Sequence, residues 1–93
     1  MTDEPVRWLP PRLTDHTRPV VLTRREAVIL TRLCEGLSNQ QIARVEHVAV
    51  DTVKTQVRAI LLRLGARDRV HAAVMAVTGQ VDITVQKTLR GAA

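Results

Sequence analysis

Aromatic side chains are almost absent from this chain of 93 residues, which has one tryptophan and neither tyrosine nor phenylalanine. Proteins that bind single-stranded nucleic acid stack the bases on aromatic rings, so this composition argues against that class. A core without aromatic rings has to be built from Leu, Ile, Val and Ala, which suits packed helices. The length allows one domain, near the lower end of what folds unaided.

Clusters of reactive side chains are also missing. Cys34 is the only cysteine, so no internal disulfide can form, and its place in a helical pattern predicts a small buried residue in a reducing cytoplasm. His16, His47 and His71 are scattered, with no cysteine or histidine at metal-ligand spacing. Asp15 and His16 lie in a proline-rich segment, where an acid–base site is not expected. A Gly-rich phosphate loop is also absent from the sequence. Taken together, these absences predict no enzyme activity, no metal and no cofactor.

Long apolar runs are missing too, since none approaches the roughly 20 residues that span a bilayer. The first residues, MTDEPVRWLPPRL, lack the basic and apolar regions of a signal peptide. We therefore expect a cytoplasmic protein without a membrane segment. All four prolines fall within the first 19 residues, which disfavours a helix and predicts a proline-rich arm over residues 1–20. Trp8 and Leu9 could still dock this arm onto the domain.

Positive charge is concentrated in the middle of the chain. The whole sequence carries a formal net charge of +5, with a pI near 11.0. Residues 1–23 contain three basic and three acidic side chains, whereas residues 24–69 contain nine basic and five acidic ones, a net +4. Such a balance suits a polyanion, either nucleic acid or a membrane surface. A membrane-surface binder would need a strongly amphipathic basic helix, which the sequence lacks.

The first helix is predicted to begin at a capping box formed by Thr23 and Glu26, whose side chains would satisfy free backbone N–H groups reciprocally. Gly36 is expected to end this helix, because glycine readily adopts the left-handed conformation. The apolar residues that recur at helical spacing, and that are expected to form its buried face, are Ala27, Leu30, Cys34 and Leu37.

A second, short helix is expected to start at the capping box of Ser38 and Gln41 and to end at about Val45. Its inward side chains are expected to be Ile42 and Ala43. A turn over residues 46–49 then precedes a third helix at about residues 50–64, which Gly65 ends. The third helix carries the clearest apolar stripe of the chain: Val53, Val57, Ile60, Leu61 and Leu64. Two helices separated by a turn of this size predict a helix-turn-helix.

A fourth helix is predicted from about Arg67 to Val77. The side chains expected inward are Val70, Ala73, Val74 and Val77, and those expected outward are Ala72, Met75 and Ala76. The outward set forms either a dimer interface or ordinary surface, and we predict the dimer interface. Beyond Gly79, the alternating Val81, Ile83 and Val85 fit a strand or no regular structure, and we expect residues 81–93 to be an irregular tail.

The outward face of the third helix carries the chemistry that a DNA-reading helix needs. Its short or basic side chains near the N-terminal end are Thr52, Lys54, Thr55 and Arg58. There the helix dipole favours phosphate, and the side chains can meet base edges in the major groove. Lys54 and Arg58 are four residues apart and therefore share a face. The alternative is an ordinary solvated helix surface.

From Leu22 to about Gly79 the chain resembles the GerE-like DNA-binding domain of LuxR/FixJ-type bacterial regulators. The matching strings are LTRREAVIL, EGLSNQQIA, TVKTQV and LGARDRVHAAV, in the family's order and spacing. The resemblance implies that the third helix reads the major groove and that the fourth pairs subunits across a pseudo-palindromic site. The family's base-contact and phosphate-contact positions fall on Asp51, Thr52, Lys54, Thr55 and Arg58.

This sequence departs from the family pattern around the turn. Ala49 stands where the family commonly has a Ser or Thr cap, and Glu46 stands where it commonly has Leu. A slight rotation of the second helix would let Val45 replace that leucine, and Arg44 and His47 are candidate partners for the Glu46 carboxylate. Two further departures are Gln56, where His or Tyr is common, and the apolar Leu62 at a position that is usually polar.

The sequence thus predicts an all-α, four-helix helix-turn-helix domain over residues 21–80, with the arm before it and the tail after it. The predicted function is that of a bacterial transcription regulator, associated with the nucleoid, which binds a specific duplex-DNA sequence as a homodimer. Two alternatives stay open: an adaptor that binds a sigma factor or another regulator, and a module like the fourth region of a sigma factor that acts on RNA polymerase. Glu46, Ala49 and Leu62 are the features that favour the adaptor.

Overall fold

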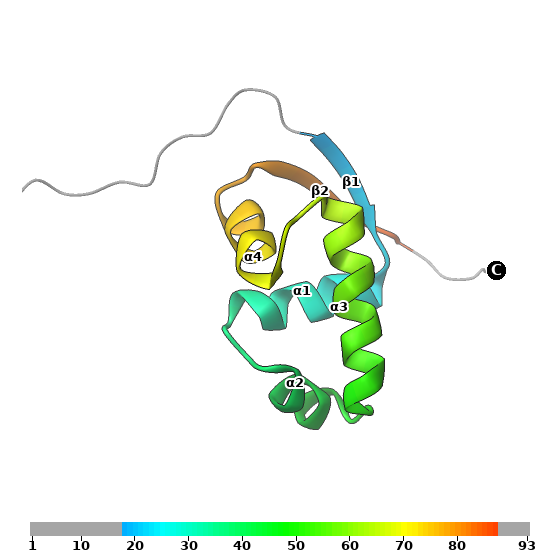
Figure 1. The fold of residues 1–93 in the computed structure, drawn as a ribbon. Helices are drawn as coiled ribbons and strands as arrows, with labels where there is room; N and C mark the ends of the chain where they lie inside the picture. Colours follow the sequence, from blue (N-terminus) through cyan, green and yellow to red (C-terminus); the bar gives the residue numbers. More distant parts are fainter. Residues whose placement is uncertain (1–17, 88–93) are drawn as a thin grey trace, which may run out of the picture.

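The computed structural model describes residues 18–87 and arranges four helices and two short strands around one core (Figure 1). The elements in chain order are β1 (Arg18–Leu22), α1 (Arg24–Cys34), α2 (Asn39–Glu46), α3 (Val50–Leu64), α4 (Arg69–Val77) and β2 (Val81–Val85). The four predicted helices are therefore confirmed. The expectations for residues 1–17, which make up most of the proline-rich arm, and for residues 88–93 lie outside the described residues.

The predicted capping residues begin α1 and α2. The hydroxyl of Thr23 accepts a hydrogen bond from the backbone N–H of Glu26 at 3.0 Å, and the Glu26 carboxylate accepts one from the Thr23 N–H at 2.9 Å. Ser38 and Gln41 make the same reciprocal pair at 3.1 and 2.8 Å. Gly65 ends α3 with a φ of 72°, a left-handed conformation that costs a glycine little.

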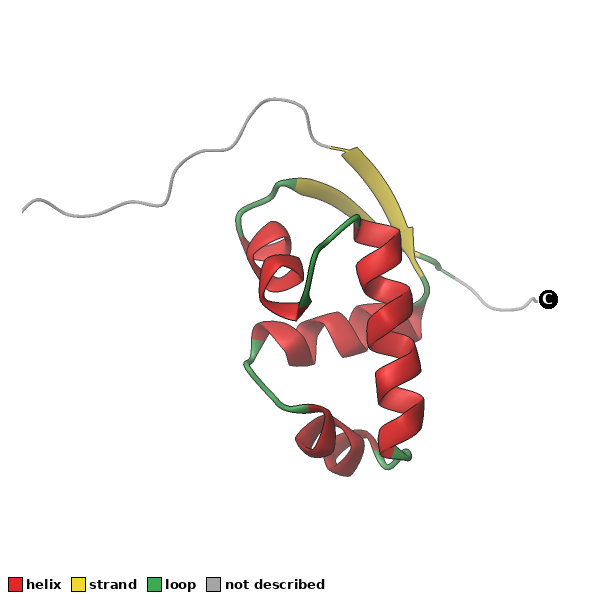
Figure 2. Cartoon of the chain, viewed as in Figure 1, coloured by secondary structure: helices red, strands yellow, loops and turns green. Residues whose placement is uncertain are grey.

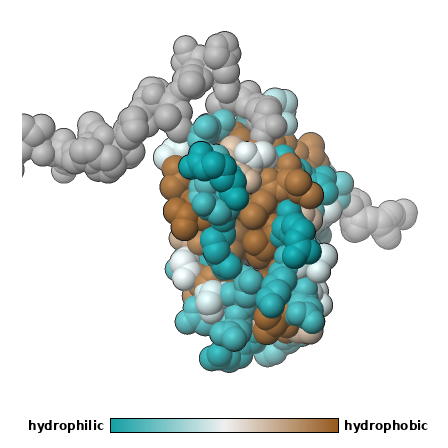
Figure 3. All heavy atoms as spheres, viewed as in Figure 1, coloured by the Kyte–Doolittle hydropathy of each residue, from teal (hydrophilic) through white to brown (hydrophobic). Residues whose placement is uncertain are grey.

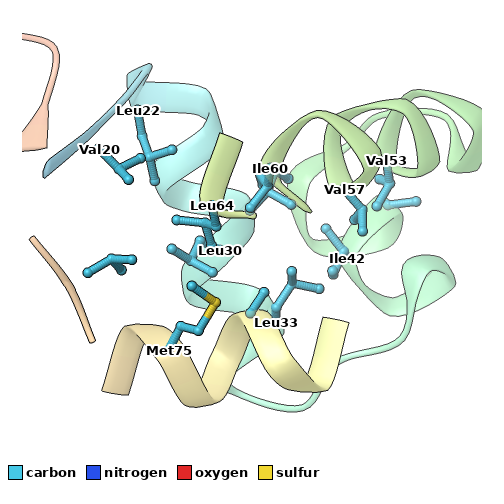
Figure 4. Close-up of a cluster of buried hydrophobic side chains, with 14 residues drawn as sticks. Val20, Leu22, Leu30, Leu33, Ile42, Val53, Val57, Ile60, Leu64 and Met75 are labelled. Atoms are coloured by element: carbon cyan, nitrogen blue, oxygen red, sulfur yellow. The ribbon is translucent and has the colours of Figure 1, made fainter. Parts of the chain in front are cut away.

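The core lies where the four helices and the strands meet, and within residues 18–87 it contains no aromatic ring (Figure 4). On α3 the predicted stripe is confirmed for Val53, Val57, Ile60 and Leu64, which are buried, whereas Leu61 is only partly buried. On α1 the buried apolar face is instead Ile29, Leu30 and Leu33. The expectation that Cys34 is buried is wrong: its side chain is exposed. The observed face is shifted by one residue toward the N-terminus of α1 relative to the predicted one. The apolar residues of α1 fit two overlapping stripes, and contact with α4 selects one of them.

The predicted orientation of α4 is also wrong. Ala72 and Met75, which were expected to point outward, are buried, whereas Val70, Val74 and Val77 are 68%, 44% and 70% exposed. Seven of the nine residues of this helix are apolar, so periodicity alone does not select a face. Packing against α1 and α3 does select one: the small Ala72 lets the backbones approach and Met75 fills the space beside it.

The two strands form a small parallel sheet that brings the two ends of the described chain together (Figure 2). Arg18 pairs with Val81 and Leu22 with Val85, and the side chains of Val20, Leu22 and Val81 enter the core. The all-α class therefore needs correction by two strands, and the expected irregular tail is wrong for Val81–Val85. Pro19 fits in β1 because each strand of a two-stranded sheet has a free edge, where a missing N–H is tolerated.

Candidate nucleic-acid interface

The outer face of α3 begins directly after the turn that joins it to α2. All five residues predicted to contact DNA lie on this face and are exposed: Asp51, Thr52, Lys54, Thr55 and Arg58. Buried Val53 and Val57, which alternate with them along the helix, fix α3 against α1 and α2. The sequence therefore places these side chains in one patch through helical periodicity alone.

The turn itself consists of three residues, His47, Val48 and Ala49. His47 adopts a left-handed conformation with a φ of 58°, and it is the only non-glycine residue with positive φ among the described ones. Val48 is partly buried against the core, and its N–H donates to the carbonyl of Ala43 at 3.0 Å. Ala49 caps α3 without a side-chain hydrogen bond. The prediction that α3 has no side-chain cap at its N-terminus is therefore confirmed.

Ion pairs within the protein occupy three of the nine basic side chains of residues 24–69. Arg25, Arg32 and Arg63 each contact a glutamate within 3.1 Å. A fourth, Arg69, donates hydrogen bonds to the side chain of Asn39 and to the carbonyl of Leu37, each at 2.8 Å. Within residues 18–87 the exposed basic side chains of that segment that make no ion pair are Arg24, Arg44, Lys54, Arg58 and Arg67.

Lys54 and Arg58 are the two unpaired cations on the outer face of α3, and they line a hollow of about 270 Å³ together with Asn39, Val57 and Leu61. Asn39 is the first residue of α2, so the hollow lies between the beginning of α2 and the face of α3. The hydrogen bond from Arg69 orients the Asn39 side chain toward α4. The hollow therefore joins two cations with the positive end of a helix dipole.

Glu46 is the residue that sequence reasoning placed with the wrong partners. Its side chain is only 12% exposed, and its two carboxylate oxygens each accept a hydrogen bond at 2.9 Å, one from Arg25 and one from Arg32 of α1. Neither Arg44 nor His47 is its partner. The predicted replacement of the family leucine by Val45 is also wrong, because Val45 is 47% exposed.

This ion-pair cluster joins α2 to α1. Hydrogen bonding to Arg32, with a smaller contribution from Arg25, holds the pKa of Glu46 below its usual value even though burial acts in the opposite direction. The hydrogen bond from Arg32 to Glu35, and to a smaller extent the one to Glu46, raises the pKa of the Arg32 guanidinium above its usual value. One signal in the sequence could have identified the cluster: Arg25 and Arg32 are seven residues apart and so lie on one face of α1.

Hydropathy differs between the two ends of the molecule. In the view of Figure 3, hydrophobic side chains are frequent in the upper half, where hydrophilic groups interrupt them, whereas the part around α2 is mostly hydrophilic. Residues 18–87 contain no group of three His, Cys, Asp or Glu side chains that could hold a metal ion. No helix in this part of the chain is long and apolar enough to cross a membrane.

Known proteins share the segment that carries these features. The family model of bacterial regulatory proteins of the luxR family matches residues 20–76. The response regulator protein VraR of Staphylococcus aureus (strain NCTC 8325 / PS 47) is 45% identical over 56 residues, which cover 60% of this chain and 27% of that protein. The VraR proteins of Staphylococcus epidermidis and Staphylococcus saprophyticus match equally well. The alignment thus spans about a quarter of the length of these relatives.

Proposed function

The chain belongs to the luxR family of bacterial regulatory proteins, and on this premise we propose that it regulates transcription by binding a specific duplex-DNA sequence through α3. The observation that carries the proposal is the exposed patch of Asp51, Thr52, Lys54, Thr55 and Arg58 on the N-terminal half of α3. This half of a helix that follows a helix-turn-helix turn is the part that can enter the major groove.

The proposed contacts divide into two kinds. Lys54 and Arg58 can donate hydrogen bonds to the acceptor atoms of guanine, while Thr52 and Thr55 are short enough to meet either base edges or backbone. The N–H groups at the beginning of α2 and the unpaired Arg44 suit phosphates, which position a protein but carry no sequence information. Asp51 lies in the first turn of α3, where a carboxylate is favoured by the helix dipole and can accept a hydrogen bond from cytosine.

We propose a homodimer that binds two half-sites, with α4 as the interface. Of the residues predicted to form this interface, Ala72 and Met75 are buried in the monomer and cannot contribute, and only Ala76 is partly exposed. The exposed Val70, Val74 and Val77 supply the apolar surface that a self-complementary two-fold interface needs. Val74→Glu should leave the monomer folded and reduce the stoichiometry on a two-half-site duplex from two chains to one, as measured by sedimentation.

The cellular setting follows from the same proposal: a cytoplasmic regulator at the nucleoid, in which residues 21–80 bind DNA and contacts with RNA polymerase or a sigma factor come after binding. One observation favours an adaptor instead. Leu62, on the side of α3 away from the core, is 79% exposed, and such a residue suits a protein partner. An adaptor would bind duplexes only at non-specific strength.

Selection from a pool of random duplexes tests the proposal. The intact protein should enrich a pseudo-palindromic sequence, and the variant with Lys54→Ala and Arg58→Ala should not. A matched control removes the same charge elsewhere through Arg24→Ala and Arg67→Ala, since both side chains are exposed and make no ion pair within residues 18–87. The control should retain the sequence preference. No enrichment by the intact protein, or equal losses in both variants, would reject the assignment of α3.

A further inference from the structure

An apolar groove runs between the end of α1 and the exposed face of α4. It has a volume of about 350 Å³. The side chains that line it and matter here are Leu33, Cys34, Leu37, Val70, Val74 and Val77. Because three valines of this surface are 44–70% exposed, the groove leaves more apolar area in contact with water than isolated surface residues do.

The sheet places Arg18, where the described residues begin, near the end of α4, which borders this groove. Arg18, the first residue of β1, pairs with Val81, and Val81 follows Val77 of the groove by only four residues. The described chain therefore begins at Arg18, beside the segment that leads from α4 into β2 (Figure 1), and seventeen residues precede it in the sequence. Trp8 precedes Arg18 by ten residues, which reach at most about 33–36 Å when fully extended.

The composition of that segment suits an apolar groove. It contains the only aromatic residue of the chain, Trp8, next to Leu9 and two residues after Val6. Pro5, Pro10 and Pro11 flank these residues. Prolines favour an extended polyproline conformation whose backbone needs no hydrogen-bonded partner strand, so such a segment can lie in a groove at a low cost in entropy.

We infer that residues 5–9 dock into the groove between α1 and α4, with the Trp8 indole against Val74 and Val77. A short tether gives the segment an effective concentration of about millimolar, so even a weak intramolecular contact is populated. A second copy of the protein that uses α4 has to displace the segment. The arm thereby opposes dimerisation, and the inference holds or fails independently of whether the protein binds DNA.

The intrinsic fluorescence of the protein can report this contact, because Trp8 is the only tryptophan and the sequence has no tyrosine or phenylalanine. In the native protein we expect Trp8 emission at shorter wavelength, with weaker quenching by acrylamide, than in the same protein in urea. Val74→Asp should abolish both differences, since it places a charge in the groove. The matched control Leu62→Asp changes an exposed apolar residue that does not line the groove and should retain them.

Protein concentration separates the two possible occupants of the groove. Protection of Trp8 that persists on dilution supports docking within one chain. Protection that disappears on dilution would show that a second copy covers the indole and would overturn the inference. Emission that is the same with and without urea, or protection that survives Val74→Asp, would overturn it as well.

A second readout uses Cys34, which lines the groove and is the only cysteine. Trp8→Ala should increase the rate at which a thiol-specific disulfide reagent modifies Cys34, because the docked segment no longer covers it. Leu62→Ala should leave that rate unchanged, and all three proteins should react equally in urea. An unchanged rate in the Trp8→Ala protein would contradict the docking site.

Discussion

The α2 end and the α4 end of this small domain are held by different forces. At the α4 end, Ala72, Met75 and Val81 join an apolar core with α1, α3 and the sheet. At the α2 end, only Ile42 and Ala43 of α2 are buried. The contact between α2 and α1 adds the carboxylate of Glu46, which lies between two arginines of α1.

This difference relates to what each end exposes. The α2 end presents unpaired cations and polar side chains next to the beginning of a helix, a surface that suits a polyanion. The α4 end presents exposed valines and an apolar groove, a surface that suits another apolar chain segment. The part that faces the proposed DNA combines the apolar contacts of Ile42, Val53 and Val57 with the ion pairs of Glu46. Four predictions test the comparison.

The largest effect is expected at the one large apolar side chain of α2 that is buried. Ile42 is fully buried, and Ile42→Ala should reduce the free energy of unfolding by about 2–5 kcal/mol through lost burial and a residual cavity. Urea denaturation monitored by circular dichroism measures the loss. Arg44→Ala, on the exposed side of α2, serves as the control and should change stability little. If Ile42→Ala cost no more than the control, α2 would depend on its polar contacts alone.

The second prediction concerns DNA affinity at the α2 end. Arg58→Ala should weaken binding to the selected duplex by about 1–3 kcal/mol and relax preference at particular base pairs. Arg24→Ala should weaken all duplexes alike or have no effect. Titrations by fluorescence anisotropy distinguish the two patterns. Both variants should unfold like the intact protein, because both side chains are exposed and make no ion pair within residues 18–87. Equal effects on all duplexes would reassign Arg58 to the phosphates.

The third prediction concerns the missing cap of α3. A serine hydroxyl at position 49 could accept a hydrogen bond from the free N–H of Asp51 or Thr52, so Ala49→Ser should stabilise the fold by about 0.5–2 kcal/mol. Thermal denaturation measures the gain, and DNA affinity should stay the same or rise. Ala66→Ser, at a position that caps no helix, is the control. A stabilised protein that still binds no specific duplex would favour the adaptor.

The smallest expected effect is a dependence of stability on pH that originates at Glu46. Because the pKa of Glu46 in the folded protein lies below the ordinary value of 4.5, the ion pairs stabilise the fold fully above that value. The contribution is lost as the pH falls through the lower folded pKa. Thermal melts of the intact protein and of Glu46→Gln should therefore differ at pH 7 and converge in acid. High salt should also reduce the difference, since Arg25 and Arg32 remain partly exposed. A constant difference across pH would show that the amide is destabilising for a reason other than charge.

The features that could be predicted from the sequence differ from those that could not in how far apart in the chain the contacting residues lie. Features that depend on neighbours within one helix could be predicted: the two capping boxes, the end of α3 at Gly65, the absent cap at Ala49, and the stripe that separates Val53 and Val57 from Lys54 and Arg58. Each follows from backbone geometry that a few consecutive residues determine.

Only the tertiary structure decided the features that depend on segments far apart in the sequence. The buried face of α4 was not predictable, because nearly every position of that helix is apolar and contact with α1 selects the side. The strand at Val81–Val85 exists because β1 offers it a partner 63 residues earlier in the chain. Glu46 is paired with Arg25 and Arg32 rather than with its sequence neighbours, because α1 and α2 bring those charges together. Local sequence determines where helices begin, end and turn polar, whereas the choice between two apolar faces, or between two cationic partners, is made by packing.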